Sequence, residues 1–291
     1  MSFTASVLIN NYNNARYIKA CVDSVLAQTR PADEIVVYDD GSTDESLAIL
    51  RGYGDRIRLI EGIHDYSRKS RASQSNAVYE GFRAARGDWL FLLDGDDLFQ
   101  PEKIELVRAA VGERRDVSLV QSPCLIVDEN GQAKGTYQDV RFHQSHLRQR
   151  IFRENDVDFF YPTSAMVVHR SAMEQIMPLD MTVCPELACD TRIAMCTPLL
   201  GEIIVLNEPL AVWRRHSTSY ITSLESSRWF QAKQTYRRVT VFNTTAQKFG
   251  VPRLRLWKNR RFLRQVVGAL LPNVVRNKLR GKSQVLTPTE S

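Results

Sequence analysis

Residues 89–97, with the sequence WLFLLDGDD, place the tightest constraint on what this chain can fold into. Five apolar residues stand in an unbroken run, and three carboxylates around one glycine follow them. A short apolar run without polar alternation is typical of a strand that is buried on both faces of a sheet. In open α/β sheets, ligands bind just beyond the carboxyl ends of such strands. The sequence therefore places an acidic cluster where a ligand would bind.

The three carboxylates, Asp94, Asp96 and Asp97, would repel one another at this spacing. A divalent cation removes that repulsion, and ligand sets made of oxygen alone suit magnesium or manganese. The alternative is a plain turn between strand and helix, with Asp97 near the helix start and Pro101 in the first turn. Such a turn explains one aspartate and leaves the other two unexplained. The cluster therefore favours a metal or nucleotide site.

The first part of the chain alternates between short apolar runs and helical patterns. The runs lie at residues 6–9, 34–38 and 57–60, and the helical patterns at 17–26 and 74–86. This alternation predicts a parallel sheet with right-handed crossovers, in which the carboxyl ends of the strands share one edge. The second run leads into DDGSTD at 39–44, so this loop and the 94–97 loop would form one site.

Two common nucleotide-binding motifs are absent from the sequence. No GxGxxG follows the first strand, which argues against a dinucleotide-binding Rossmann domain. No GxxxxGK[ST] occurs either, which argues against a P-loop nucleotidase. The second half is less regular: we expect a β-prone stretch at 117–127, a hairpin turn at 128–131, strands at 165–168, 203–206 and 210–213, and a helix at 187–200 with Asp190 in its first turn.

The charge is divided unevenly along the chain. Residues 226–291 hold 15 basic residues and one acid, whereas residues 1–225 hold 24 basic and 32 acidic residues. We therefore predict two domains, a body at 1–225 and a basic helical extension at 226–291. From Phe262 to Val275 the extension is amphipathic, and such a segment can lie in the plane of an anionic membrane. The alternatives are a helix packed on the acidic body and an RNA-binding segment, although no RNA-recognition motif accompanies the charge.

The five cysteines and the chain start indicate an intracellular protein. The cysteine number is odd and no CxxC pair occurs, which fits reduced thiols better than a disulfide framework. A zinc site from Cys184, Cys189, Cys196 and His216 matches no zinc-binding spacing. We see no signal peptide and no apolar stretch long enough to span a membrane. The expected location is cytoplasmic, peripheral at the inner face of the cytoplasmic membrane.

Six motifs in this order resemble those of the family 2 glycosyltransferases, which are inverting enzymes. The motifs are SVLINNYN (6–13), YDDGSTD (38–44), LDGDD (93–97), FYPTSAMVVHR (160–170), CD (189–190) and WRRH (213–216). The resemblance covers about residues 5–220. It implies an α/β fold of the glycosyltransferase A type, with a mostly parallel Rossmann-like sheet flanked by helices, to which the helical basic C-terminal extension is added.

The resemblance also implies how the donor is bound. Asp40 matches the aspartate that hydrogen-bonds the nucleobase, and Tyr12 would lie beside the base. Asp94 matches the first carboxylate of the DxD element, which contacts the ribose. Arg214 would bind near the donor, beside the histidine of the WRRH motif. The implied donor is a nucleotide sugar of the UDP or dTDP type.

The remaining matches concern the chemistry. Asp96 matches the second DxD carboxylate, which binds the magnesium or manganese ion that holds the diphosphate, and His216 matches a histidine that helps bind this metal in some members. Asp190 matches the catalytic base, although Cys189 stands where a glutamate often precedes it. A positioned carboxylate can deprotonate an acceptor hydroxyl, and a single displacement inverts the anomeric centre.

We therefore expect an inverting, metal-dependent glycosyltransferase that acts on a glycan or lipid-linked acceptor in cell-surface polysaccharide synthesis, with no nucleic acid as partner. One alternative is a nucleotidyltransferase, but residues 8–16 lack the basic glycine-rich phosphate loop that this class usually needs. The other is a catalytically inactive protein that binds a nucleotide sugar or RNA. Asp190 discriminates here, because a binding module needs no base.

Overall fold

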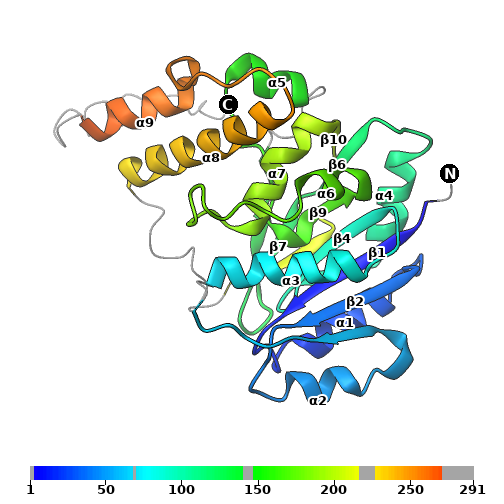
Figure 1. The fold of residues 1–291 in the computed structure, drawn as a ribbon. Helices are drawn as coiled ribbons and strands as arrows, with labels where there is room; N and C mark the ends of the chain where they lie inside the picture. The colour runs from blue at the N-terminus through cyan, green and yellow to red at the C-terminus, as the bar shows by residue number, and fades with distance from the viewer. Residues whose placement is uncertain (1–2, 68–69, 140–146, 216–226, 271–291) are drawn as a thin grey trace, which may run out of the picture.

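The protein, seen as a computed structural model, is built around a seven-stranded sheet (Figure 1). The structure describes residues 3–67, 70–139, 147–215 and 227–270. The strands run in the spatial order β10-β6-β9-β4-β1-β2-β3. Their bounds are β1 Ala5–Asn11, β2 Glu34–Asp39, β3 Arg58–Glu61, β4 Trp89–Asp94, β6 Val117–Gln121, β9 Met166–His169 and β10 Glu202–Val205. Only β9 runs against the others, so the expected mostly parallel α/β sheet is confirmed.

The central strand β4 explains the unbroken apolar run. Phe91 and Leu93 pack into one hydrophobic cluster, and Leu90 and Leu92 pack into a second cluster on the opposite face. Because side chains alternate along a strand, a strand buried on both faces must be apolar at every position. The first cluster includes residues of α1 (Ile18–Leu26), α2 (Ser46–Arg51) and α4 (Lys103–Val111), and the second includes residues of α3 (Ser70–Ala84), α6 (Arg170–Ile176) and α7 (Cys189–Leu200).

The stretch at 117–127, which the sequence predicts as continuous β structure, is divided between two sheets. Pro123 lies between β6 and β7 (Cys124–Asp128), and the chain passes there from the large sheet to a four-stranded one. Proline lacks the N–H that a continuing strand would need. The small sheet has the order β5-β11-β7-β8, with β5 Leu98–Phe99, β8 Ala133–Tyr137 and β11 Ala211–Arg215. The predicted hairpin turn at 128–131 joins β7 to β8.

The C-terminal helices lie at one end of the molecule, beside α5 (Leu147–Glu154) and far from α1 and α2 (Figure 1). The first helix of the predicted helical extension is α8 (Arg228–Lys248), which buries Val239, Phe242 and Ala246 in the second cluster of the body. The amphipathic segment forms α9 (Arg260–Leu270), and its predicted continuation beyond 270 lies outside the described residues. Among the helices of the described ranges, none is long and apolar enough to span a bilayer.

Candidate active site

Asp94 lies at the carboxyl end of β4, as the sequence predicts. Its Oδ1 accepts hydrogen bonds from Asn10 Nδ2 at 2.8 Å and Gln74 Nε2 at 3.2 Å, while its backbone N–H donates to Ser164 Oγ at 3.1 Å. Burial and the neighbouring charge of Asp96 raise the pKa of Asp94 to about 7. The carboxylate is therefore held in a fixed position, in a place where negative charge is crowded.

Gly95 allows the acidic loop to turn directly against β1. A Cβ at this position would lie 2.7 Å from Asn11 Oδ1 and 3.1 Å from the backbone oxygen of Asn10. Any side chain would therefore push the loop away from the neighbouring strand. The glycine keeps the two flanking carboxylates, Asp94 and Asp96, at the sheet edge.

Asp97 has a structural role rather than a place in an open site. It is 2% exposed, its Oδ2 accepts from Ser164 Oγ at 2.6 Å, and its Oδ1 accepts from the backbone N–H of Arg214 at 2.8 Å. The Lys103 ammonium donates a hydrogen bond to the backbone carbonyl of the same residue, Ser164, at 2.5 Å. The turn interpretation, which puts Asp97 at a helix start, is wrong in detail: β5 follows, and α4 begins only at Lys103.

Arg214 braces the acidic loop from the second sheet. Its Nε donates to the backbone oxygen of Asp96 at 3.0 Å, one terminal nitrogen donates to the backbone oxygen of Asp128 at 3.1 Å, and its guanidinium lies 4.6 Å from the centre of the Tyr17 ring. Arg214 is 8% exposed. The structure thus brings this predicted donor residue to the acidic loop. His216, the residue directly after β11, lies outside the described residues.

The loop after β2 carries Asp40 at the same sheet edge. Gly41 has a φ of +71°, and a Cβ there would lie 2.6 Å from the backbone nitrogen of His64, so the position requires glycine. Asp39 is buried and accepts hydrogen bonds from Asn11 Nδ2 and from Ser42 Oγ. Asp39 therefore holds the loop, whereas Asp40 is left to face the loop that follows β3.

His64 completes this part of the site, and the sequence analysis missed it. Its Nδ1 lies 2.7 Å from Asp40 Oδ2, and its ring stacks on Tyr12 with the ring centres 4.2 Å apart and the planes 13° from parallel. Tyr66 meets the His64 ring edge-on at 4.7 Å. The sequence did contain one signal for His64: it follows the apolar run at 57–60. That run forms β3, which ends at the same sheet edge as β2.

Asp190 lies in the first turn of α7, where its Oδ1 accepts from the Thr191 backbone N–H at 2.5 Å. Its carboxylate lies close enough to Asp94 to contribute to the raised pKa of Asp94. Arg192 fixes the segment that leads into α7. It is 2% exposed and donates to the backbone oxygens of Asp180, Val183, Cys184 and Leu187. The first turn of α7 therefore lies near the carboxyl end of β4.

A preassembled set of metal ligands is not found in the described part of the chain, where no group of three or more His, Cys, Asp or Glu side chains is arranged to hold a metal ion. Cys184, Cys189 and Cys196 therefore do not form a zinc-binding group by themselves, and His216, the fourth residue of that alternative, lies outside the described residues. The crowding of charge at Asp94 and Asp96 nevertheless fits a cation, because a bound cation would lower the cost of keeping both ionised.

Fold and site together define a glycosyltransferase of the A-type fold. The chain resembles Staphylococcus aureus TarS, solved with UDP-GlcNAc, with a TM-score of 0.60 and 18% identity over 97% of this chain and 77% of that one. It also resembles the mannosyltransferase PcManGT of Pyrobaculum calidifontis, solved with GDP-Man and Mn2+, with a TM-score of 0.56 and 16% identity over 96% of this chain and 79% of that one. At these identities, the likeness shows the fold.

The chain belongs to glycosyl transferase family 2, whose model matches residues 6–177. A glycosyltransferase of Nostoc sp. is 33% identical over 228 residues, which cover 76% of this chain and 68% of that protein. A glycosyltransferase of Rickettsia typhi is 37% identical over 100 residues, which cover 34% of this chain and 29% of that protein. The family resemblance seen in the motifs is therefore confirmed, and the nucleotidyltransferase alternative is excluded.

Proposed function

We propose that this glycosyltransferase moves a sugar from a nucleoside-diphosphate sugar of the UDP or dTDP type to a hydroxyl of a glycan or lipid-linked acceptor, with inversion and with a divalent metal. The observation that carries the proposal is the meeting of Asp94 and Asp190. They come from β4 and α7, 96 positions apart in sequence, and the charge of Asp190 acts on the Asp94 carboxyl. This closeness supports a site in which Asp94 would act on the donor side and Asp190 on the acceptor side.

The nucleoside would bind at the edge formed by the loops after β1 and β2. Tyr12 offers an aromatic face and Asp40 a buried acceptor, which together suit a nucleobase with N–H donors. In the structure, His64 covers that face and bonds to Asp40, so a base that stacks directly on Tyr12 must displace the His64 ring. Asp94, held by Asn10 and Gln74, would accept from the ribose hydroxyls.

Asp96 and His216 would hold the magnesium or manganese ion, which supplies stabilisation of the negative charge that develops on the departing diphosphate. Arg214 fixes the position of Asp96 through its bond to the Asp96 carbonyl. Asp190 would take the proton of the acceptor hydroxyl as the new C–O bond forms and the bond to the diphosphate breaks. A single displacement of this kind inverts the anomeric configuration.

The basic extension would place the enzyme at an anionic membrane surface inside the cell, where lipid-linked acceptors for polysaccharide synthesis are found. The supporting observations are the exposed apolar residues of α9, namely Leu263, Val267 and Leu270, and the 15 basic residues after position 225. Each basic residue close to an anionic surface contributes about 1 kcal/mol, so a few engaged residues give useful affinity.

A donor screen tests the proposal. The full chain is incubated with Mg2+ or Mn2+, a glycan or lipid-linked acceptor pool and, one at a time, UDP-, dTDP- and GDP-sugars, and released nucleoside diphosphate is measured. We expect release from one donor class, dependent on acceptor and on metal. Tight donor binding without any release across all donors and acceptors would support the inactive nucleotide-sugar-binding alternative instead.

A further inference from the structure

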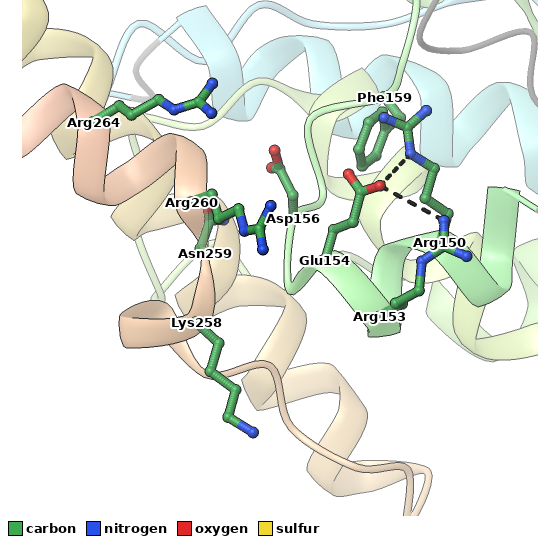
Figure 2. Close-up of a pocket in the computed structure, with 9 residues that line it drawn as sticks. All are labelled: Arg150, Arg153, Glu154, Asp156, Phe159, Lys258, Asn259, Arg260 and Arg264. Atoms are coloured by element: carbon green, nitrogen blue, oxygen red, sulfur yellow. Dashed lines mark hydrogen bonds and ion pairs between the residues drawn. The ribbon is translucent and has the colours of Figure 1, made fainter.

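A basic pocket of about 500 Å³ lies between α5 and the start of α9 (Figure 2). Five basic side chains line it: Arg150 and Arg153 from α5, Lys258 from the short 3-10 turn Leu256–Lys258 before α9, and Arg260 and Arg264 from α9. The volume is in the range of ordinary small-molecule sites. None of the residues proposed to bind the donor or metal lines the pocket.

Two carboxylates, Glu154 and Asp156, also line the pocket, so its five basic side chains outnumber its acids (Figure 2). Glu154 accepts from Arg150 at 2.7 Å and lies 3.7 Å from Arg153, so this carboxylate serves the two arginines of its own helix (Figure 2). Within the described ranges, the side chains of Lys258, Arg260 and Arg264 make no ion pair.

Two asparagines fix the walls of the pocket. Asn155, which follows α5 with a φ of +53°, accepts the backbone N–H of Arg255 on its Oδ1 at 2.7 Å. Asn259 is fully buried, donates to the Asn155 carbonyl at 2.7 Å, and caps α9 by accepting the Phe262 N–H at 2.8 Å. The opposing cations are thus held near one another by the backbone, rather than meeting through flexible side chains alone.

The start of α9 adds to the positive potential. The N-terminal end of a helix carries a partial positive charge, which acids in the first turn normally offset. The first turn of α9 has no acid and instead begins with Arg260 and Arg261. An anion bound there would interact favourably with the helix end and with the guanidinium groups at once.

We propose that this pocket binds a molecule carrying a phosphate or diphosphate group. Arginine guanidinium groups bind phosphate oxygens through two parallel N–H bonds. The buried Phe159 ring lies 4.7 Å from the Arg150 guanidinium and supports that side chain at the pocket wall. The proposal does not rest on the transfer reaction, because the pocket and the aspartate site share no residue. The phosphate group belongs either to a soluble phosphorylated compound or to the headgroup of a membrane lipid.

Inorganic pyrophosphate is the probe for the first measurement. The full chain is titrated calorimetrically in about 0.1 M salt with EDTA present, so that metal-dependent binding at the aspartate site does not contribute. We expect Arg260→Gln/Arg264→Gln to weaken pyrophosphate binding by about 10-fold or more, since two charge-assisted contacts are lost. Both side chains are exposed and lack ion-pair partners among the described residues, so the thermal midpoint should stay unchanged.

Lys233→Gln/Arg253→Gln is the matched control, because it removes the same charge from exposed positions outside the pocket. Cosedimentation with vesicles of phosphatidylglycerol, compared with phosphatidylcholine, distinguishes the two sources. If the pocket variant loses both pyrophosphate and anionic vesicles, the ligand is a lipid headgroup; if it loses pyrophosphate alone, the ligand is soluble. The proposal is overturned if the unmodified chain does not bind pyrophosphate, or if the pocket and control variants lose equal affinity.

Discussion

The aspartate edge and the basic pocket both crowd charges of one sign, but they handle the crowding differently. At the aspartate edge, Asp97 is enclosed by Ser164 and by the Arg214 backbone, and Asp94 is held by two amides. In the pocket, the cations of the α9 side stand at the surface without ion-pair partners among the described residues. Hydrogen bonds within the protein fix the positions of the carboxylates before a ligand binds, whereas the cations of the α9 side have no ion-pair partner in the described part of the chain and are left for a ligand.

The largest effect is expected at Asp96, which is partly exposed, unlike its buried neighbour Asp97. Asp96→Ala should remove metal-dependent transfer and metal-dependent donor binding, because the charge that anchors the cation is lost. Product release and donor binding with and without Mn2+ are the measurements. Asp116→Ala, an exposed aspartate paired only with Arg114, is the control. Near-normal turnover of Asp96→Ala would contradict the metal assignment.

The next largest effect is expected at Asp190. Asp190→Asn should lower turnover by about 100-fold or more while donor affinity stays nearly intact, the signature of a lost general base. The asparagine oxygen can still accept the Thr191 N–H, so the start of α7 should be preserved. Steady-state kinetics and equilibrium donor titration separate the two quantities. A collapse of donor affinity at unchanged turnover would make Asp190 a binding residue.

The next prediction concerns Lys103, a buried lysine that donates a hydrogen bond to the Ser164 carbonyl next to the aspartate edge. Burial lowers the pKa of Lys103 to about 7. Between this value and the ordinary lysine pKa, the unfolded chain binds a proton that the folded chain lacks, so the free energy of unfolding rises with pH. We expect Lys103 itself to contribute a gain of about 1.5 kcal/mol from pH 7 to 8.5, at up to about 1.4 kcal/mol per unit. The raised pKa values of Asp94 and Asp97 act in the opposite direction, so the gain is read as the difference between the unmodified chain and Lys103→Met.

Urea unfolding at the two pH values measures this gain, and Lys103→Met should abolish it. Lys233→Met removes an exposed lysine from the surface and should keep the gain. Above pH 8.5 the comparison ends, because burial raises the pKa of Cys124 to about 12 and the unfolded thiol then begins to ionise. The same pH response in Lys103→Met and in the unmodified chain would show that Lys103 is not the group responsible.

The smallest effect concerns the apolar side of the extension. Leu263→Ser/Val267→Ser should weaken binding to phosphatidylglycerol vesicles by about 10-fold, because insertion of the exposed apolar face of α9 is lost. Cosedimentation at low and high salt measures the change, and high salt should release the unmodified chain only in part. Leu26→Ser removes an exposed leucine from the body and serves as the control. Equal vesicle binding by all three proteins would argue for an extension that does not insert.

The sequence predicted those parts of the molecule that depend on local pattern. The apolar run of β4 and the loops that carry Asp40 and Asp94 are encoded by neighbouring residues, so fold class and sheet edge could be inferred. The contact of His64 with Asp40 depends on the order β1-β2-β3, which a single sequence does not specify. The basic pocket joins α5 to a helix over 100 positions later, and Asn155 and Asn259 give no sign in sequence that they pair.

The placement of α8 bears on how genes of this kind can be recombined. Val239, Phe242 and Ala246 fill the same hydrophobic cluster as α7, and the Phe242 ring meets Phe152 of α5 at 5.8 Å. A body transferred without α8 would expose that apolar surface to water and tend to aggregate. The catalytic part and at least the first helix of the extension must therefore be inherited together, whereas α9, which leaves much of its apolar face open, can change more freely.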